Sequence, residues 1–253
     1  MSGAARPPAR TGGRDALVAA GLLLALWQGL HLYAGDAALA SPAAALGALR
    51  QLAGTAAFWG HCAATAQAFA AALALSAAIG LALGLWLGLR RFAGEVAEPL
   101  LAGLYAIPKI TLYPVILLVF GLGLGAKVAF GVIHGFVPIA LFTLGAVKSL
   151  DPVLLRTARA LRLSRAQTVR FVLAPAALPE IVAGLRVGFS LTLLGVLIGE
   201  MFASQAGLGF LIVNGTALHN VRLTTAVILT VVVLAVGANA ALLWLDRRYV
   251  RRG

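Results

Sequence analysis

Long apolar segments separated by short polar stretches dominate this chain. A helix that crosses the hydrocarbon core of a bilayer needs about 20 mainly apolar residues. Six segments approach or exceed that length, and a shorter amphipathic stretch at 43–61 leads into the second. The six are residues 16–33, 65–89, 99–120, 127–147, 187–202 and 223–245. The pattern predicts an all-α fold, a polytopic membrane helical bundle of about six transmembrane helices.

Composition excludes a soluble globular fold. Of the 253 residues, 61% are hydrophobic and 11% charged, and the mean hydropathy is +0.98. Soluble domains carry about a quarter charged residues. A core of this size cannot bury so much apolar surface, so lipid must cover the remainder. The single cysteine, Cys62, excludes an intrachain disulfide and a C-x-x-C metal site.

Basic residues gather at alternate ends of the predicted spans, and the net charge is +12. With the N-terminus in the cytoplasm, only Arg50, Lys127 and Arg222 fall outside, and Lys109 lies within a span. Cytoplasmic loops carry such an excess of Lys and Arg, so we expect both termini in the cytoplasm. Alternatively, the first apolar run is a signal peptide cleaved near 38–40, but its length favours a retained helix.

Residues 150–185 interrupt the apolar pattern and predict two short helices. Asp151 is a good N-cap, and the proline after it suits the first helical position. Ser164, followed three residues later by Gln167, is a capping-box signature for a second helix. Pro175 and the proline at 179 are expected to break the chain before the fifth span.

Arginines recur every three residues in this segment and would form one ridge if the first helix continued unbroken. They are Arg156, Arg159, Arg162 and Arg165. A basic loop on the cytoplasmic side would explain the charge alone. Two capped helices with small residues beside the basic ones favour a second interpretation, a helix–turn–helix that docks a cytoplasmic partner.

Five residues inside the spans are candidates for a translocation path. Lys109 lies between Pro108 and Pro114, and two such close prolines predict a broken or kinked third span. An intramembrane charge marks either a pathway or a pair. Lys109 therefore either faces a path for an anionic solute or forms an ion pair with Glu200. His134 is expected to be an interior residue that hydrogen-bonds a carbonyl, because one His shows no metal-ligand spacing.

Glycines recur every four residues in the second span, at Gly80, Gly84 and Gly88. Small residues at this spacing let helices approach closely. Packing within the chain is the favoured interpretation, and a contact between subunits is the alternative.

Motifs for nucleotide hydrolysis and catalysis are missing from the sequence. It contains no G-x-x-x-x-G-K-[ST] phosphate loop and no HExxH, CxxC or GxSxG. Neither an enzyme activity nor a metal site nor a cofactor bound by this chain is therefore expected.

Several motifs resemble the permeases of ATP-binding-cassette (ABC) importers. The conserved cytoplasmic loop of these permeases has the pattern EAA, three residues, Gly, and then an apolar stretch that contains proline. Three segments of this chain are similar to that loop: LRTARALRLSRAQ (155–167), VLAPAALP (172–179) and AGLR (183–186). The nitrate/sulfonate/taurine branch of the family is similar to this chain at YAIPKITLYP (105–114), FGLG (120–123) and GEMFASQAGLG (199–209). The resemblance covers about residues 61–248.

The resemblance implies that this chain is the membrane-spanning subunit of an importer with the type I permease fold. In the family the loop forms a coupling helix seated in a groove of a separate ATPase, which binds the ATP. A periplasmic solute-binding protein delivers the solute, and we expect its surface of contact to include residues 205–220. We also expect a permease homodimer in the bacterial inner membrane and a small anion of the nitrate, sulfonate or taurine type. The implied coupling residues are Arg156, Thr157, Ala158, Arg159, Ala160, Leu161, Arg162, Leu163, Ser164 and Arg165.

The coupling loop departs from the family pattern. Arg156 stands in place of the Glu, Thr157 in place of the first Ala, and Arg162 in place of the Gly that ends the first short helix. Glycine would supply a left-handed turn there. Either Arg162 turns the chain without it, or the helix continues. The added cations predict an ATPase with a more acidic groove, or altered coupling.

The expected organisation has four parts. Residues 1–15 form a disordered cytoplasmic tail, and residues 16–58 the first transmembrane helix with a periplasmic amphipathic segment. Residues 59–246 form the permease core with its coupling segment at 150–185, and residues 247–253 a basic cytoplasmic tail. The alternative class is an ion-gradient-driven secondary transporter, which usually shows paired broken helices in internal repeats. Only one broken span is predicted here.

Overall fold

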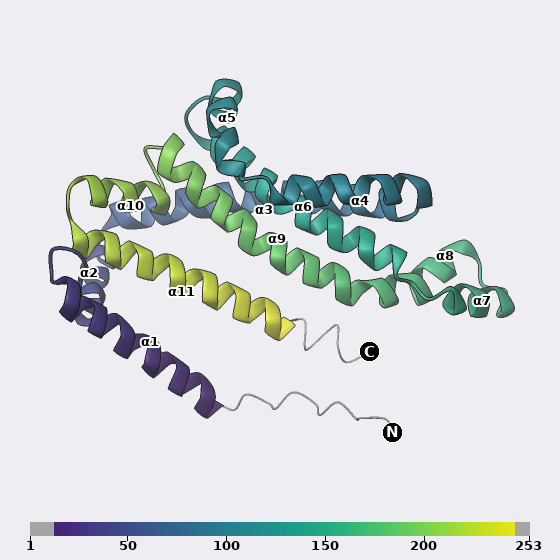
Figure 1. Cartoon of the computed structure of the whole chain (residues 1–253), viewed down its shortest axis with the longest axis horizontal. Helices are drawn as coiled ribbons and strands as arrows, with labels where there is room; N and C mark the ends of the chain where they lie inside the picture. Colours follow the sequence, from purple (N-terminus) through teal and green to yellow (C-terminus); the bar gives the residue numbers. More distant parts are fainter. Residues whose placement is uncertain (1–12, 246–253) are drawn as a thin grey trace.

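The computed structural model describes residues 13–245, which form helices and no strands (Figure 1). Five of the described helices are long and apolar enough to cross a membrane, and a bent pair brings the number to six if it crosses as one span. The five are α1 (Gly13–Ala34), α3 (Ala56–Gly88), α6 (Leu124–Lys148), α9 (Ala174–Ala203) and α11 (Val221–Leu245). The predicted all-α membrane bundle is confirmed. Apart from residues 13–15, the tails predicted at 1–15 and 247–253 lie outside the described residues.

The third span is broken, as its prolines predict. Helix α4 (Arg91–Ala106) ends just before Pro108, and the 3-10 helix η1 (Lys109–Leu112) and α5 (Tyr113–Phe120) leave it at an angle of 84°. The break arises because proline holds the preceding residue in extended backbone. Pro114 stands in the first turn of α5, where its missing N–H breaks no helical hydrogen bond. In Figure 1, α5 projects from the bundle.

Helix α6 is the centre of the bundle and packs between α3 and α9. A Cβ added to Gly80 would lie 2.7 Å from the Cβ of Ile139, and one added to Gly84 would lie 2.6 Å from the carbonyl oxygen of Ala140. Helices that approach this closely need glycine at the contact. The predicted packing of the glycine series within the chain is therefore confirmed.

Helix α1 stands apart from this core and packs chiefly against α2 (Pro42–Ala53). The residues of its membrane-length window are all accessible. The link to α2 is fixed by hydrogen bonds from Trp27 Nε1 to the carbonyl of Ala40 (3.0 Å) and from His31 Nδ1 to the carbonyl of Leu39 (2.7 Å). Helix α1 is thus tied at one end, and its apolar length requires an apolar surrounding.

The predicted starts of the second and fifth spans are wrong. Helix α3 starts at Ala56, because Thr55 Oγ1 caps the helix by accepting a hydrogen bond from Phe58 N. Helix α9 starts at Ala174 and contains both Pro175 and Pro179. Pro175 follows just after the π-helical turn η2 (Val169–Leu173), and Pro179 lies inside the helix. The chain therefore stays helical through both prolines, and the predicted break before the fifth span is wrong.

Different helices and turns lie at the two ends of the elongated molecule (Figure 1). The turn between α3 and α4 and the short helices α7 (Pro152–Ala160) and α8 (Arg165–Thr168) lie toward one end. Helices α2 and α10 (Leu208–Ala217) lie toward the other. From that second end, α11 runs in the direction of α7 and α8, and α1 is traced back from α2 in the same direction.

Candidate functional site

The two short helices predicted in the basic segment are present, and both are capped. Asp151 Oδ1 accepts a hydrogen bond from Val153 N at 2.8 Å. Ser164 and Gln167 form the capping box: Gln167 N donates to Ser164 Oγ at 3.2 Å, and Ser164 N donates to Gln167 Oε1 at 2.9 Å. Helix α8 then continues through a π-helical turn, η2 (Val169–Leu173), into α9.

Helix α7 ends in a turn that normally uses glycine. Leu163 N donates to the carbonyl of Ala158, and Arg162 N to the carbonyl of Arg159, both at 3.0 Å. This is the Schellman pattern, which needs a left-handed residue. Arg162 supplies it with φ +53°. The chain therefore turns without glycine, and the arginine series is divided between two helices and does not form one ridge.

The outer surface of α7 is basic. Arg156, Arg159 and Arg162 are exposed, whereas Ala158 among them is only 2% exposed. The small residue therefore packs inward and the cations face away from the bundle. Residues 152–168, which we call the α7–α8 segment, present this positive surface at one end of the molecule.

At the opposite end, Glu200 lies fully buried near the end of α9. Thr65 Oγ1 of α3 donates to its two carboxylate oxygens at 3.0 and 2.9 Å, and Gly209 N donates at 3.0 Å. Lys127 Nζ of α6 lies 3.6 Å from Glu200 Oε1. The carboxylate thus meets the first turn of α10, where negative charge is favoured, and an ammonium group that compensates its burial. We call these four residues the Glu200 cluster.

The turn between α9 and α10 is shaped around this carboxylate. Gly207 has φ +121°, and a Cβ there would overlap the Glu200 carboxylate. Gly207 N donates to His61 Nδ1 at 3.1 Å, and Lys127 Nζ donates to the carbonyl of Ala206 at 2.6 Å. The motif GEMFASQAGLG therefore joins α3, α6, α9 and α10 in one polar contact.

The predicted alternative of an ion pair between Lys109 and Glu200 is wrong, because Glu200 pairs with Lys127. The signal for the true pair was available: Lys127 begins the fourth predicted span and Glu200 ends the fifth, and antiparallel neighbours bring those ends together. In this conformation the buried Glu200 carboxylate offers no surface to a solute.

Lys109 lies at the break of the third span, half-buried. Its Nζ donates to the carbonyl of Tyr105 at 2.9 Å and lies 5.2 Å from the centroid of the Tyr105 ring. His134 is buried in α6, and its Nδ1 lies 2.8 Å from the carbonyl oxygen of Phe130, so the ring donates to it. The predicted interior role of His134 is confirmed, and its part in a path stays a prediction.

A cavity of about 530 Å³, which we call the α9 cavity, opens among α4, α6, α9 and α11. It is lined by Tyr105, Phe142, Ala183, Arg186, Val187, Ser190, Leu191 and Asn239. The cavity was not predicted from the sequence, because Arg186 falls among the expected cytoplasmic cations. Asn239, a single amide in an otherwise apolar span, was the available signal.

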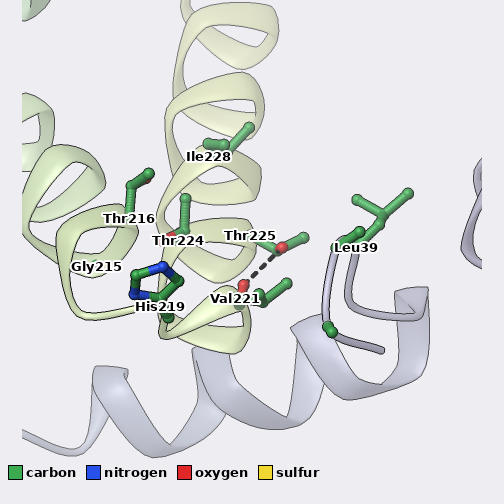
Figure 2. A pocket seen from close by; sticks show the side chains of 10 residues that line it. Leu39, Gly215, Thr216, His219, Val221, Thr224, Thr225 and Ile228 are labelled. Carbon is green, nitrogen blue, oxygen red and sulfur yellow. Dashed lines mark hydrogen bonds between the residues drawn. The ribbon is translucent and has the colours of Figure 1, made fainter. Parts of the chain in front are cut away.

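A second cavity, of about 310 Å³, lies between the α1–α2 loop and the α10–α11 turn (Figure 2). Figure 2 shows His219 and Thr224 on one side and Leu39 on the other. His219 is exposed and has φ +53°. It makes the same kind of turn after α10 that Arg162 makes after α7, since Asn220 N donates to the carbonyl of Gly215 at 2.8 Å.

A broken span, a capped basic segment at one end and a cavity among the long helices together point to a transporter subunit. The family model described as the inner membrane component of binding-protein-dependent transport systems matches residues 74–251. The chain belongs to this family. As a binding-protein-dependent permease it is a multi-pass inner-membrane protein, and its family is one of transport proteins and not of enzymes. The family also disfavours the secondary transporter.

Relatives of this permease carry different solutes. It is 36% identical over 232 residues to the riboflavin transport system permease protein RibX of Chloroflexus aurantiacus. The aligned region covers 91% of this chain and 87% of the relative. It is 31% identical over 153 residues to the taurine transport system permease protein TauC of Escherichia coli. This aligned region covers 60% of this chain and 56% of the relative. Family membership therefore does not by itself give the solute.

Solved structures support the fold. An inward-facing conformation of the MetNI methionine ABC transporter aligns with a TM-score of 0.59 and 21% identity, over 77% of this chain and 96% of that one. The permease thus has the fold of ABC-importer permeases, as predicted.

Proposed function

We propose that two copies of this permease enclose the translocation path of an ATP-driven importer. A separate ATPase binds ATP and docks on the α7–α8 segment, and an extracytoplasmic solute-binding protein docks at the opposite end, near α10. In this arrangement both termini are cytoplasmic. The single observation that carries the proposal is the α7–α8 segment: it is capped at both helix starts, basic on its outer surface and joined directly to α9.

The charge of this segment specifies the partner. Arg156 and Arg159 are exposed on α7, and Arg156 stands where the family carries Glu. A groove that accepts these side chains must be complementary in charge, because like charges across an interface repel. The ATPase of this importer therefore has an acidic groove where the α7–α8 segment binds.

We further propose that the solute is a small anion of the nitrate, sulfonate or taurine type. Lys109 supports this, because its ammonium group stands at the broken span, where an intramembrane charge usually serves a pathway or a pair. The similarity to TauC supports a sulfonate, and the similarity to RibX favours riboflavin as the solute to test against it.

Charge reversal tests the docking proposal. The permease is co-expressed with the ATPase encoded beside it, and co-purification and ATPase rate are measured for wild type and for Arg156→Glu with Arg159→Glu. We expect the double variant to lose the complex. Arg50→Glu, an exposed arginine of α2 at the other end of the molecule, should keep it. A double variant that binds the ATPase like wild type would contradict the proposal.

A further inference from the structure

The α9 cavity gathers polar groups from three helices, α4, α9 and α11. Arg186 and Ser190 lie one turn apart on α9, on the same face, and Tyr105 and Asn239 come from α4 and α11. The Ser190 hydroxyl donates to the carbonyl of Arg186 at 3.4 Å. Polar side chains inside a membrane bundle are costly and mark pathways or partners.

Arg186 is the charged residue among the described residues that line the α9 cavity. The ammonium group of Lys109 lies 5.2 Å from the ring of Tyr105, which also lines it. None of the described lining residues is acidic. A guanidinium has five N–H donors, so Arg186 can hold a protein partner and still donate to a solute. A cleft whose charges have one sign concentrates ions of the other sign.

The remaining lining suits an organic molecule. Tyr105 and Phe142 contribute aromatic rings, and Ala183, Val187 and Leu191 contribute apolar surface. Asn239 adds an amide N–H₂ that can donate to the oxygens of an acidic group, and the Ser190 hydroxyl can do so when it rotates away from the Arg186 carbonyl. Such a mixture of apolar walls and a few converging polar groups is typical of small-molecule sites.

We propose that the α9 cavity is a solute-binding site for small organic anions within the membrane. Arg186, Ser190 and Asn239 hold the acidic group, and Tyr105 and Phe142 flank the organic part. The site rests on the proposed function, because it places these residues on the translocation path. It also predicts that quaternary ammonium compounds are excluded.

Charge-selective thiol reagents test this site. The permease with its ATPase is placed in lipid nanodiscs, with Cys62→Ala as background and Ser190→Cys or Asn239→Cys as reporter. Reaction rates are compared for sulfonatoethyl and trimethylammonioethyl methanethiosulfonate. Their ratio at Ala57→Cys, an exposed position in the first turn of α3, is the reference. We expect a preference for the sulfonate on the order of tenfold at both reporters, largely abolished by Arg186→Gln.

Three results would overturn the proposal: a ratio equal to the Ala57→Cys reference, a preference for the cationic reagent, or no reaction with either reagent at both reporters. If one reporter fails to fold, the other decides. Co-purification of the ATPase is recorded in the same samples. An assembled complex without the sulfonate preference refutes the anion site alone, whereas the preference without assembly refutes the importer proposal.

Discussion

At the scale of residues, Glu200 and Lys127 form a buried ion pair in the described chain. Their side chains are 0% and 6% exposed. The carboxylate also accepts hydrogen bonds from Thr65 and from Gly209, so its position is fixed from three helices. Taking away one partner of a buried pair leaves the other charge uncompensated, which costs much more than losing an exposed pair.

Lys127→Met is therefore expected to destabilise the protein by about 3–5 kcal/mol and to lower Tm by roughly 10 °C. Tm is measured by size-exclusion chromatography of a fluorescent fusion after heating. Lys127→Met combined with Glu200→Gln should recover part of the loss, because neither charge then remains. Lys148→Met breaks the largely exposed pair with Glu98 and should cost less than about 1 kcal/mol. Equal effects of the two single variants would refute the buried-pair interpretation.

At the scale of elements, the sequence predicts what local chemistry decides. The cap at Asp151, the capping box at Ser164 and the break before Pro108 each depend on a few neighbouring residues, and each is found where predicted. Elements that depend on distant contacts were missed. Helix α10 is only ten residues long. Its first backbone N–H groups donate to the Thr65 hydroxyl and to the Glu200 carboxylate, and Thr65 lies 143 residues before Leu208 in the sequence.

The turn after α7 carries a prediction at this scale. A left-handed backbone costs a non-glycine residue about 1–2 kcal/mol, so Arg162→Gly should stabilise the end of α7. We expect amide hydrogen exchange in α7 to slow about fivefold, the factor that corresponds to roughly 1 kcal/mol. His219→Gly has the same starting φ of +53° and should slow exchange in α10 instead. Unchanged exchange in α7 of Arg162→Gly would contradict the strain argument.

At the scale of the whole molecule, the two ends of the permease differ in charge and in packing. The basic α7–α8 segment lies at one end and the Glu200 cluster at the other, with the broken span and the α9 cavity between them. The sequence located the first of these through its arginines and caps. It did not predict the cavity, because that depends on how four helices assemble.

Lys109→Met tests the path between those ends. In proteoliposomes with the complete importer, we expect uptake of the anionic solute to fall about tenfold while the ATPase rate stimulated by the binding protein is retained. The reason is that the substitution removes a cation near the path and leaves both docking ends intact. Lys109→Arg keeps the charge and should restore uptake. Loss of assembled protein in Lys109→Met would instead assign Lys109 a structural role.

The continuity of α9 has a mechanical consequence. This helix has 30 residues and thus a length of about 45 Å, and it has the π-helical turn at one end and Glu200 near the other. If the helix moves as a rigid body, a tilt of about 5° about the end next to α8 moves the far end by roughly 4 Å. A displacement of that size is comparable to the width of a small solute.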